Sequence, residues 1–92
     1  MALYTFIMEF MGGTYISQVR EKTLVKACLK WARTLNSDDI KGLGPKGHDL
    51  LIREVEEECQ PVPISDTRNV WCTSARIKGR LGLIHVVQTS ED

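Results

Sequence analysis

Two histidines and three cysteines are the residues of this chain whose side chains are best suited to chemistry. His85 and Cys72 fall in two segments that we expect to pair as strands, and one register would place them side by side. A thiolate next to an imidazole is a nucleophilic arrangement. A cysteine buried as a small hydrophobic residue beside a partly exposed histidine gives the same pattern without reactivity, and we favour that interpretation. The sequence therefore leans against an enzyme and predicts no catalytic residue.

The cysteines are odd in number and share no C-x-x-C spacing: Cys28, Cys59 and Cys72. This pattern argues against a disulfide framework and a thiolate zinc site, and it fits a reducing compartment. Neither histidine is paired with a carboxylate in a metal-binding spacing, so we expect no metal and no cofactor.

The stretch Ile40–Leu51 combines glycines and a lysine just before a predicted helix. It resembles the hairpin and second helix of the helix-hairpin-helix motif, in which a Gly-hydrophobic-Gly turn presents backbone N–H groups to a nucleic-acid phosphate. Helix N-termini and glycine turns bind anions for electrostatic reasons. A glycine-rich connection between two helices that binds no ligand can have the same residue pattern. The resemblance implies phosphate contacts from a turn and a neighbouring basic helix face: Gly42, Leu43, Gly44 and Lys46, with Lys26, Lys30 and Arg33.

A second similarity covers Tyr4–Ala32. Its predicted hairpin, followed by Thr-Leu-x-x-Ala at a helix start, is similar to the N-terminal part of HicB-type antitoxins. This resemblance implies packing of a helix on a sheet and a regulatory role.

Charge and composition bound the range of partners. Twelve basic and twelve acidic side chains give a formal net charge of zero, which argues against a general attraction to nucleic acid or anionic membrane and leaves little repulsion against self-association. No run approaches the ~18 apolar residues of a membrane span. The N-terminal segment carries Glu9 and lacks the positively charged residues with which a signal peptide begins. We therefore expect a cytoplasmic protein without membrane contact.

The element that must organise the fold is a predicted helix over 23–35. Its apolar residues recur at helical spacing, and Thr23 is suited to cap its first turn. The preceding segment, Leu3–Phe10, alternates with period two, and Gly12-Gly13 predicts a hairpin turn before the return strand Thr14–Arg20. In that register Phe10 would face Tyr15, Met8 would face Ser17, and Phe6 would face Val19.

The rest of the chain predicts a short helix and a second hairpin. Residues 36–68 are punctuated by glycine and proline, with a helix at His48–Glu58. Val70–Ile77 and Leu81–Gln88 predict strands around Lys78-Gly79-Arg80, with two- and three-residue loops both open. Because the last segment is apolar at almost every position, one helical layer cannot cover both of its faces, so we expect a dimer or partner contact. The residues assigned to that interface are Trp71, Leu83 and Val87.

We therefore predict one α+β domain over 1–92, with two layers and the order β-β-α-α-β-β. A four-stranded antiparallel sheet would combine the hairpins at 1–21 and 69–89, with the long helix at 23–35 and the short one at 48–58. The functional prediction is a small soluble interaction module that associates with itself or with a protein partner. The alternatives are a nucleic-acid-binding accessory protein, an antitoxin-like regulatory domain and, third, an enzyme built on Cys72 and His85.

Overall fold

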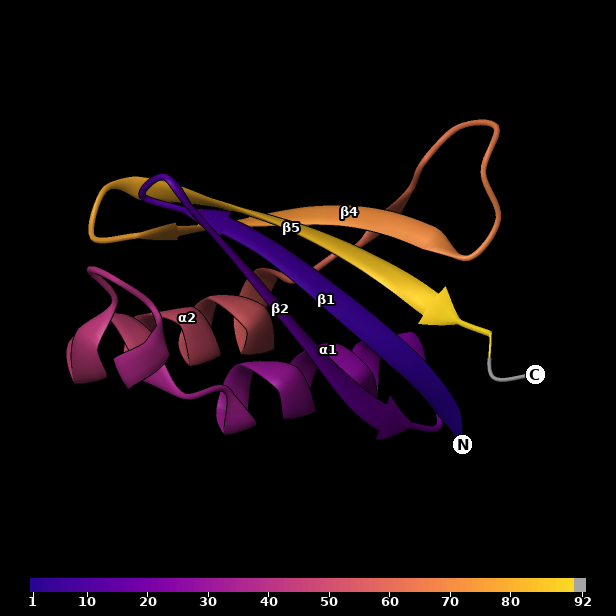
Figure 1. The fold of residues 1–92 in the computed structure, drawn as a ribbon, viewed down its shortest axis with the longest axis horizontal. Coiled ribbons are helices and arrows are strands. Elements are labelled where there is room, and N and C mark those ends of the chain that lie inside the picture. The colour runs from indigo at the N-terminus through magenta and orange to yellow at the C-terminus, as the bar shows by residue number, and fades with distance from the viewer. Residues whose placement is uncertain (91–92) are drawn as a thin grey trace.

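A five-stranded antiparallel sheet carries both helices on one of its faces (Figure 1). The computed structural model describes residues 1–90. The strands lie in the spatial order β2-β1-β5-β4-β3. Their bounds are Ala2–Phe10 for β1, Gly13–Glu21 for β2, Val62–Pro63 for β3, Val70–Ile77 for β4 and Arg80–Thr89 for β5. The helices are α1 (Leu24–Thr34) and α2 (Gly44–Glu58), joined through a 3-10 turn, η1 (Ser37–Asp39).

The α+β class and the antiparallel sheet are confirmed, but the strand number and the element order are wrong. The sheet has five strands instead of four, and the chain order is β-β-α-α-β-β-β. The additional strand, β3, lies in the glycine- and proline-containing segment 36–68, for which we predict a short helix and no strand. Val62 pairs with Cys72, and Pro63 pairs with Trp71. Proline is tolerated there because β3 is an edge strand whose outer side needs no N–H donor.

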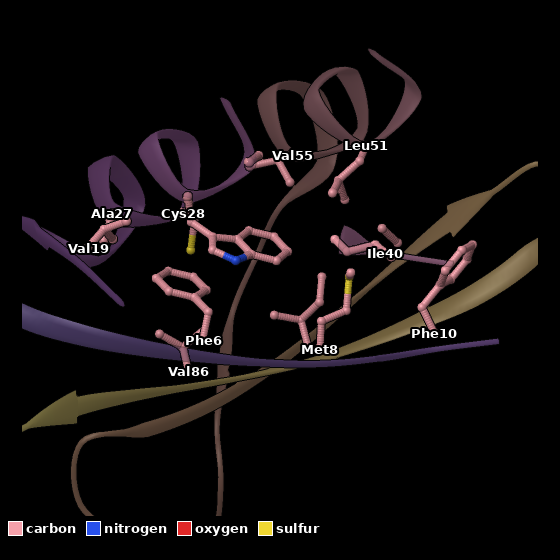
Figure 2. Close-up of a cluster of buried hydrophobic side chains, with 14 of the residues drawn as sticks. Phe6, Met8, Phe10, Val19, Ala27, Cys28, Ile40, Leu51, Val55 and Val86 are labelled. Atoms are coloured by element: carbon pink, nitrogen blue, oxygen red, sulfur yellow. The ribbon is translucent and has the colours of Figure 1, made fainter. Parts of the chain in front are cut away.

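The predicted core is confirmed around α1. Thr23 caps the helix by accepting a hydrogen bond from the Lys26 backbone N–H. The Trp31 ring is only 4% exposed and stacks on Phe6 with 5.0 Å between the ring centroids. Figure 2 shows Phe6, Met8 and Phe10 directed from β1 toward the helical layer. The alternation of β1 therefore fixes which of its residues face the helices.

The turn of the first hairpin differs from the prediction. Met11 and Gly12 form the two-residue loop, both with positive φ (49° and 81°), so Phe10 pairs with Gly13 and Met8 with Tyr15. Gly12-Gly13 was the wrong pair because Met11 accepts the left-handed conformation beside a single glycine. The register moves by two residues, so every side chain keeps its predicted face.

Helix α2 begins at Gly44, four residues before the predicted start, and is longer than α1. Pro45 lies in its first turn, where a missing N–H costs nothing. Gly47 is buried, and a Cβ added there would lie 3.1 Å from Leu43 and 3.4 Å from Ile77. The residues Gly44, Pro45 and Gly47, whose types favour a loop, therefore belong to the closely packed first turn of α2.

The second hairpin has the two-residue loop Lys78-Gly79, since Ile77 pairs with Arg80. This register places Cys72 directly opposite His85. Both side chains point away from the helices, because the covered positions of β5 are the buried Ile84 and Val86.

Candidate functional site

The face of the sheet opposite the helices is the candidate site, and we call it the open face. Among residues 1–90, no helix covers it (Figure 1). Antiparallel sheets with one solvated face usually carry polar residues there. Here the register brings nine apolar residues to the open face: Leu3, Ile7, Ile16, Val62, Val70, Cys72, Leu81, Leu83 and Val87. Such a concentration is typical of an interface.

One line of paired residues crosses all five strands of the open face. We call it the central row: Ile16, Ile7, His85, Cys72 and Val62. Its two ends are the most exposed, with Ile16 at 66% and Val62 at 62%. The central row carries no fixed charge and has His85 as its only polar member, so a mainly hydrophobic stripe crosses this face.

The polar groups beside this stripe are largely paired within the chain. The hydroxyls of Thr5 and Thr89 are hydrogen-bonded to each other, and Gln18 Nε2 donates to Thr5 Oγ1 at 3.0 Å. Polar groups that already have partners lose less when they are removed from water. Burial of the open face would therefore be opposed mainly by the desolvation of His85, of the exposed Ser74 and of the outermost side chains.

The charged residues of the open face lie at its margin. Glu9, Arg20 and Arg76 each stand one residue from the end of a strand. An apolar centre with a polar rim is the usual anatomy of a protein interface.

Two of the three predicted interface residues lie on the open face. Leu83 and Val87 are half-buried there. Trp71 points to the covered side, where its ring lies 6.5 Å from that of Tyr4. The sequence reasoning missed Ile7 and Ile16. The mixed outer face of the first hairpin was visible in the alternation, but its alignment with β5 depends on a pairing far apart in the chain.

The predicted phosphate turn lies at the start of α2 and is engaged in internal contacts. Leu43 is fully buried, and its N–H donates to Ile40 at 3.1 Å. Its carbonyl accepts from Gly47 N–H and from Lys78 Nζ at 3.1 and 3.2 Å. A Cβ at Gly42 would collide with the sulfur of Met11. The N–H groups of Gly44 and Lys46 belong to the first helical turn, where anions are favoured.

Two of the three predicted basic residues of α1 have partners elsewhere. Lys30 Nζ donates to the Arg20 carbonyl at 3.1 Å, and Arg33 lies 3.6 Å from Glu56. Glu56 stands twelve residues beyond Gly44, ~18 Å along α2, so Arg33 does not join the turn. Lys26 is exposed on the first half of α1. Nucleic-acid binding through these residues stays a prediction.

Two cysteines on the covered side form a thiol pair that the sequence analysis did not detect. Cys28 is buried in α1, and Cys59 is the half-buried C-cap of α2. A hydrogen bond with the Cys28 thiol lowers the pKa of Cys59 to about 7; burial opposes this shift, and the Thr73 hydroxyl adds to it. The pKa of Cys28 is raised, first by its bond with Cys59 and then by burial. This pair requires α1 and the end of α2 to meet, which residue spacing does not reveal.

Other chemistry has little support in the described part of the chain. Cys72 and His85 are neighbours, but within residues 1–90 no hydrogen bond joins the thiol to the imidazole. His48 Nε2 is instead hydrogen-bonded to the Ala32 carbonyl at 2.7 Å, which links the two helices. Residues 1–90 contain no group of three or more His, Cys, Asp or Glu side chains suited to a metal ion. No described helix is long and apolar enough to span a membrane.

Comparisons with known proteins identify no family: no protein-family model, no curated protein and no solved structure matches this chain.

Proposed function

We propose that the protein is an interaction module that associates with a second copy of itself through the open face. The observation that carries this proposal is the set of nine apolar residues on a sheet face that lacks a helical layer. Two such faces would pack as a sandwich about 10 Å apart, with their rows interdigitating.

The size and charge of the face support a second copy as the partner. The paired region measures roughly 30 Å by 20 Å, from ~3.4 Å per residue and ~4.8 Å per strand. This projection of about 600 Å² is of the same order as the ~800 Å² of accessible surface that each partner contributes to a standard interface. The central row contains no Asp, Glu, Lys or Arg, and the formal net charge is zero, so there is little repulsion between identical faces.

The test is the association state of the protein, measured by sedimentation over a range of concentrations. Val87→Lys places a charge in the open face and should weaken the dimer about a hundredfold, because the ammonium would be buried without a partner. Val25→Lys is the matched control. Val25 is 59% exposed on α1, so the same change there should leave the dimer intact.

Two results would contradict the proposal. The first is a wild-type protein that stays monomeric at millimolar concentration. The second is a dimer that both lysine variants leave unchanged, or that only Val25→Lys disrupts. Either outcome would show that the open face is not the surface of self-association.

A further inference from the structure

The two edges of the sheet differ in their protection, and β2 is the unprotected one. It spans nine residues and, within residues 1–90, pairs only with β1. The segment Thr14–Val19 contains no charged residue and no proline. Natural edge strands are usually blunted by such residues, by short length or by a bulge. An edge without these features offers a row of backbone donors and acceptors to another chain.

The opposite edge shows the usual protection. β3 has only two residues, one of them Pro63. Beyond it, the Arg76 backbone N–H donates to Glu54 Oε1 at 3.2 Å, so a helix side chain occupies the edge of β4. Within one sheet, therefore, one edge is closed by a proline strand and a carboxylate, and the other is open.

The register shows which groups of β2 face outward. Phe10 and Gly13 flank the two-residue loop and form the hydrogen-bonded pair, so backbone groups alternate inward and outward from there. The outward groups belong to Thr14, Ile16 and Gln18. The hydrogen bond that Lys30 Nζ donates to the Arg20 carbonyl agrees with this assignment, because that carbonyl also faces outward. It marks where the open part of the edge ends.

A cleft of about 260 Å³ lies beside this edge, on the covered side of the sheet. Its apolar wall is formed by Met8, Trp31, Leu35 and Ile40, and Asp39 contributes its only formal charge. The volume is below the ~300–1,000 Å³ of pockets for drug-sized ligands and suits one or two side chains. Peptides that add to a sheet edge place alternate side chains in such a cleft.

We propose that the β2 edge binds an extended peptide from a partner protein as an antiparallel sixth strand. Its backbone pairs with Thr14, Ile16 and Gln18, one large apolar side chain enters the cleft, and a basic side chain faces Asp39. Within residues 1–90, Asp39 forms no ion pair, so its carboxylate can take a cationic partner.

A second copy of β2 fits this edge less well. Antiparallel pairing of β2 with itself would bring only its own covered-side residues to the cleft: Gly13, Tyr15, Ser17, Val19 and Glu21. None of these carries a positive charge for Asp39. A partner peptide that supplies both a large apolar and a basic side chain fits the cleft better.

The test uses the acetylated, amidated heptapeptide Thr-Val-Thr-Phe-Thr-Lys-Thr and amide NMR of the isotope-labelled protein. In the proposed orientation the threonine N–H groups point toward β2, while lysine, phenylalanine and valine face the cleft. Peptide addition should shift the amides of Thr14, Ile16 and Gln18. N-methylation of the third and fifth residues should weaken binding about tenfold or more, since two backbone bonds are lost. N-methylation of the lysine and phenylalanine should leave binding unchanged.

A variant of the protein tests the same edge from the other side. Gln18→Pro removes an outward N–H without disturbing the ladder to β1, so the chain should fold and bind the heptapeptide about tenfold more weakly. If that variant does not fold, Asp39→Asn provides a second test. This change should weaken the binding of the lysine-containing heptapeptide two- to fivefold. It should leave the binding of a peptide with threonine in place of lysine unchanged.

Several outcomes would overturn the proposal. These are the absence of shifts at millimolar peptide, shifts centred on β4 or β5, and equal effects of the two N-methylation patterns. Amide shifts of β2 that depend on protein concentration without peptide, and that persist in the Val87→Lys variant, would identify a second copy at this edge. Val87→Lys should bind the peptide like the wild type, so failure of the open-face dimer and failure of this site are distinguishable.

Discussion

The two faces of the sheet use alternate residues of the same strands, yet only one of them is covered. On β1, Phe6 is fully buried beneath Trp31, while the next residue, Ile7, lies in the central row of the open face. Both residues are apolar, so hydrophobicity alone does not distinguish them. The comparison shows that an alternating pattern assigns residues to the two faces of a strand. The position of the helices then decides which face is covered. A chain with two apolar faces and one helical layer has a surface left for a partner.

The largest expected effect compares Phe6→Ala with Ile7→Ala. Phe6→Ala removes a fully buried ring stacked on Trp31 and should lower the free energy of unfolding by about 3–5 kcal/mol. Ile7→Ala should cost much less in the monomer, because Ile7 is partly solvated. Denaturant unfolding at concentrations that keep the chain monomeric measures both. Equal losses would mean that the open face is packed as tightly as the covered one.

A smaller and closer comparison uses two identical side chains on β5. Val86 is fully buried and Val87 is half-buried on the open face. Val86→Ala should cost about 2 kcal/mol of unfolding free energy, from lost apolar burial and a small cavity. Val87→Ala should change the monomer by about 0.5 kcal/mol or less.

The same unfolding experiment can be repeated at high protein concentration. If the open face joins two copies, the loss caused by Val87→Ala should grow with concentration, because the dimer stabilises the folded chain by mass action. The loss caused by Val86→Ala should stay nearly constant. A concentration-independent Val87→Ala would argue against the open-face dimer.

The covered half of the fold follows from local patterns in the sequence. Helical spacing around Trp31 and the alternation of Leu3–Phe10 depend on neighbouring residues, and both predicted faces are confirmed. The details that failed depend on backbone choices with near-equal alternatives. Met11 with Gly12 competes with Gly12-Gly13 as a turn, and Pro45 can end a loop or begin a helix.

The candidate surfaces depend on pairings far apart in the chain. Leu83 and Val87 could be identified because their segment is apolar at almost every position. Ile7 and Ile16 can be assigned to the same surface only from the pairing of β1 with β5, which lies about eighty residues away in sequence. The free edge at β2 likewise requires the strand order. A single sequence shows which residues are apolar, but not which strand lies last in the sheet.

The smallest expected effect compares the thiols on the two sides of β4. Cys59 contacts Thr73 on the covered side, and Cys72 belongs to the open face. Because a hydrogen bond from Cys28 stabilises the thiolate, the pKa of Cys59 is lowered to about 7. The rate of Cys59 alkylation by iodoacetamide should therefore rise with pH to a half-maximum near 7, followed by mass spectrometry of the labelled peptide. Lower-pKa thiolates are weaker nucleophiles, so the gain over an ordinary thiol at neutral pH is only a few-fold.

Two controls separate the contribution of the fold from that of the thiol. In urea the contact with Cys28 is lost, and the half-maximum for Cys59 should move to about 8.5, the value of an ordinary thiol. Cys28→Ser replaces the donor with a hydroxyl and should keep part of the shift, whereas Cys28→Ala should raise the half-maximum of Cys59 above that of the wild type. A Cys59 profile that is the same in folded and unfolded protein would mean that the thiol pair does not stabilise the charged form. In that case the covered side, like the open face, would hold its cysteine only as a small apolar residue.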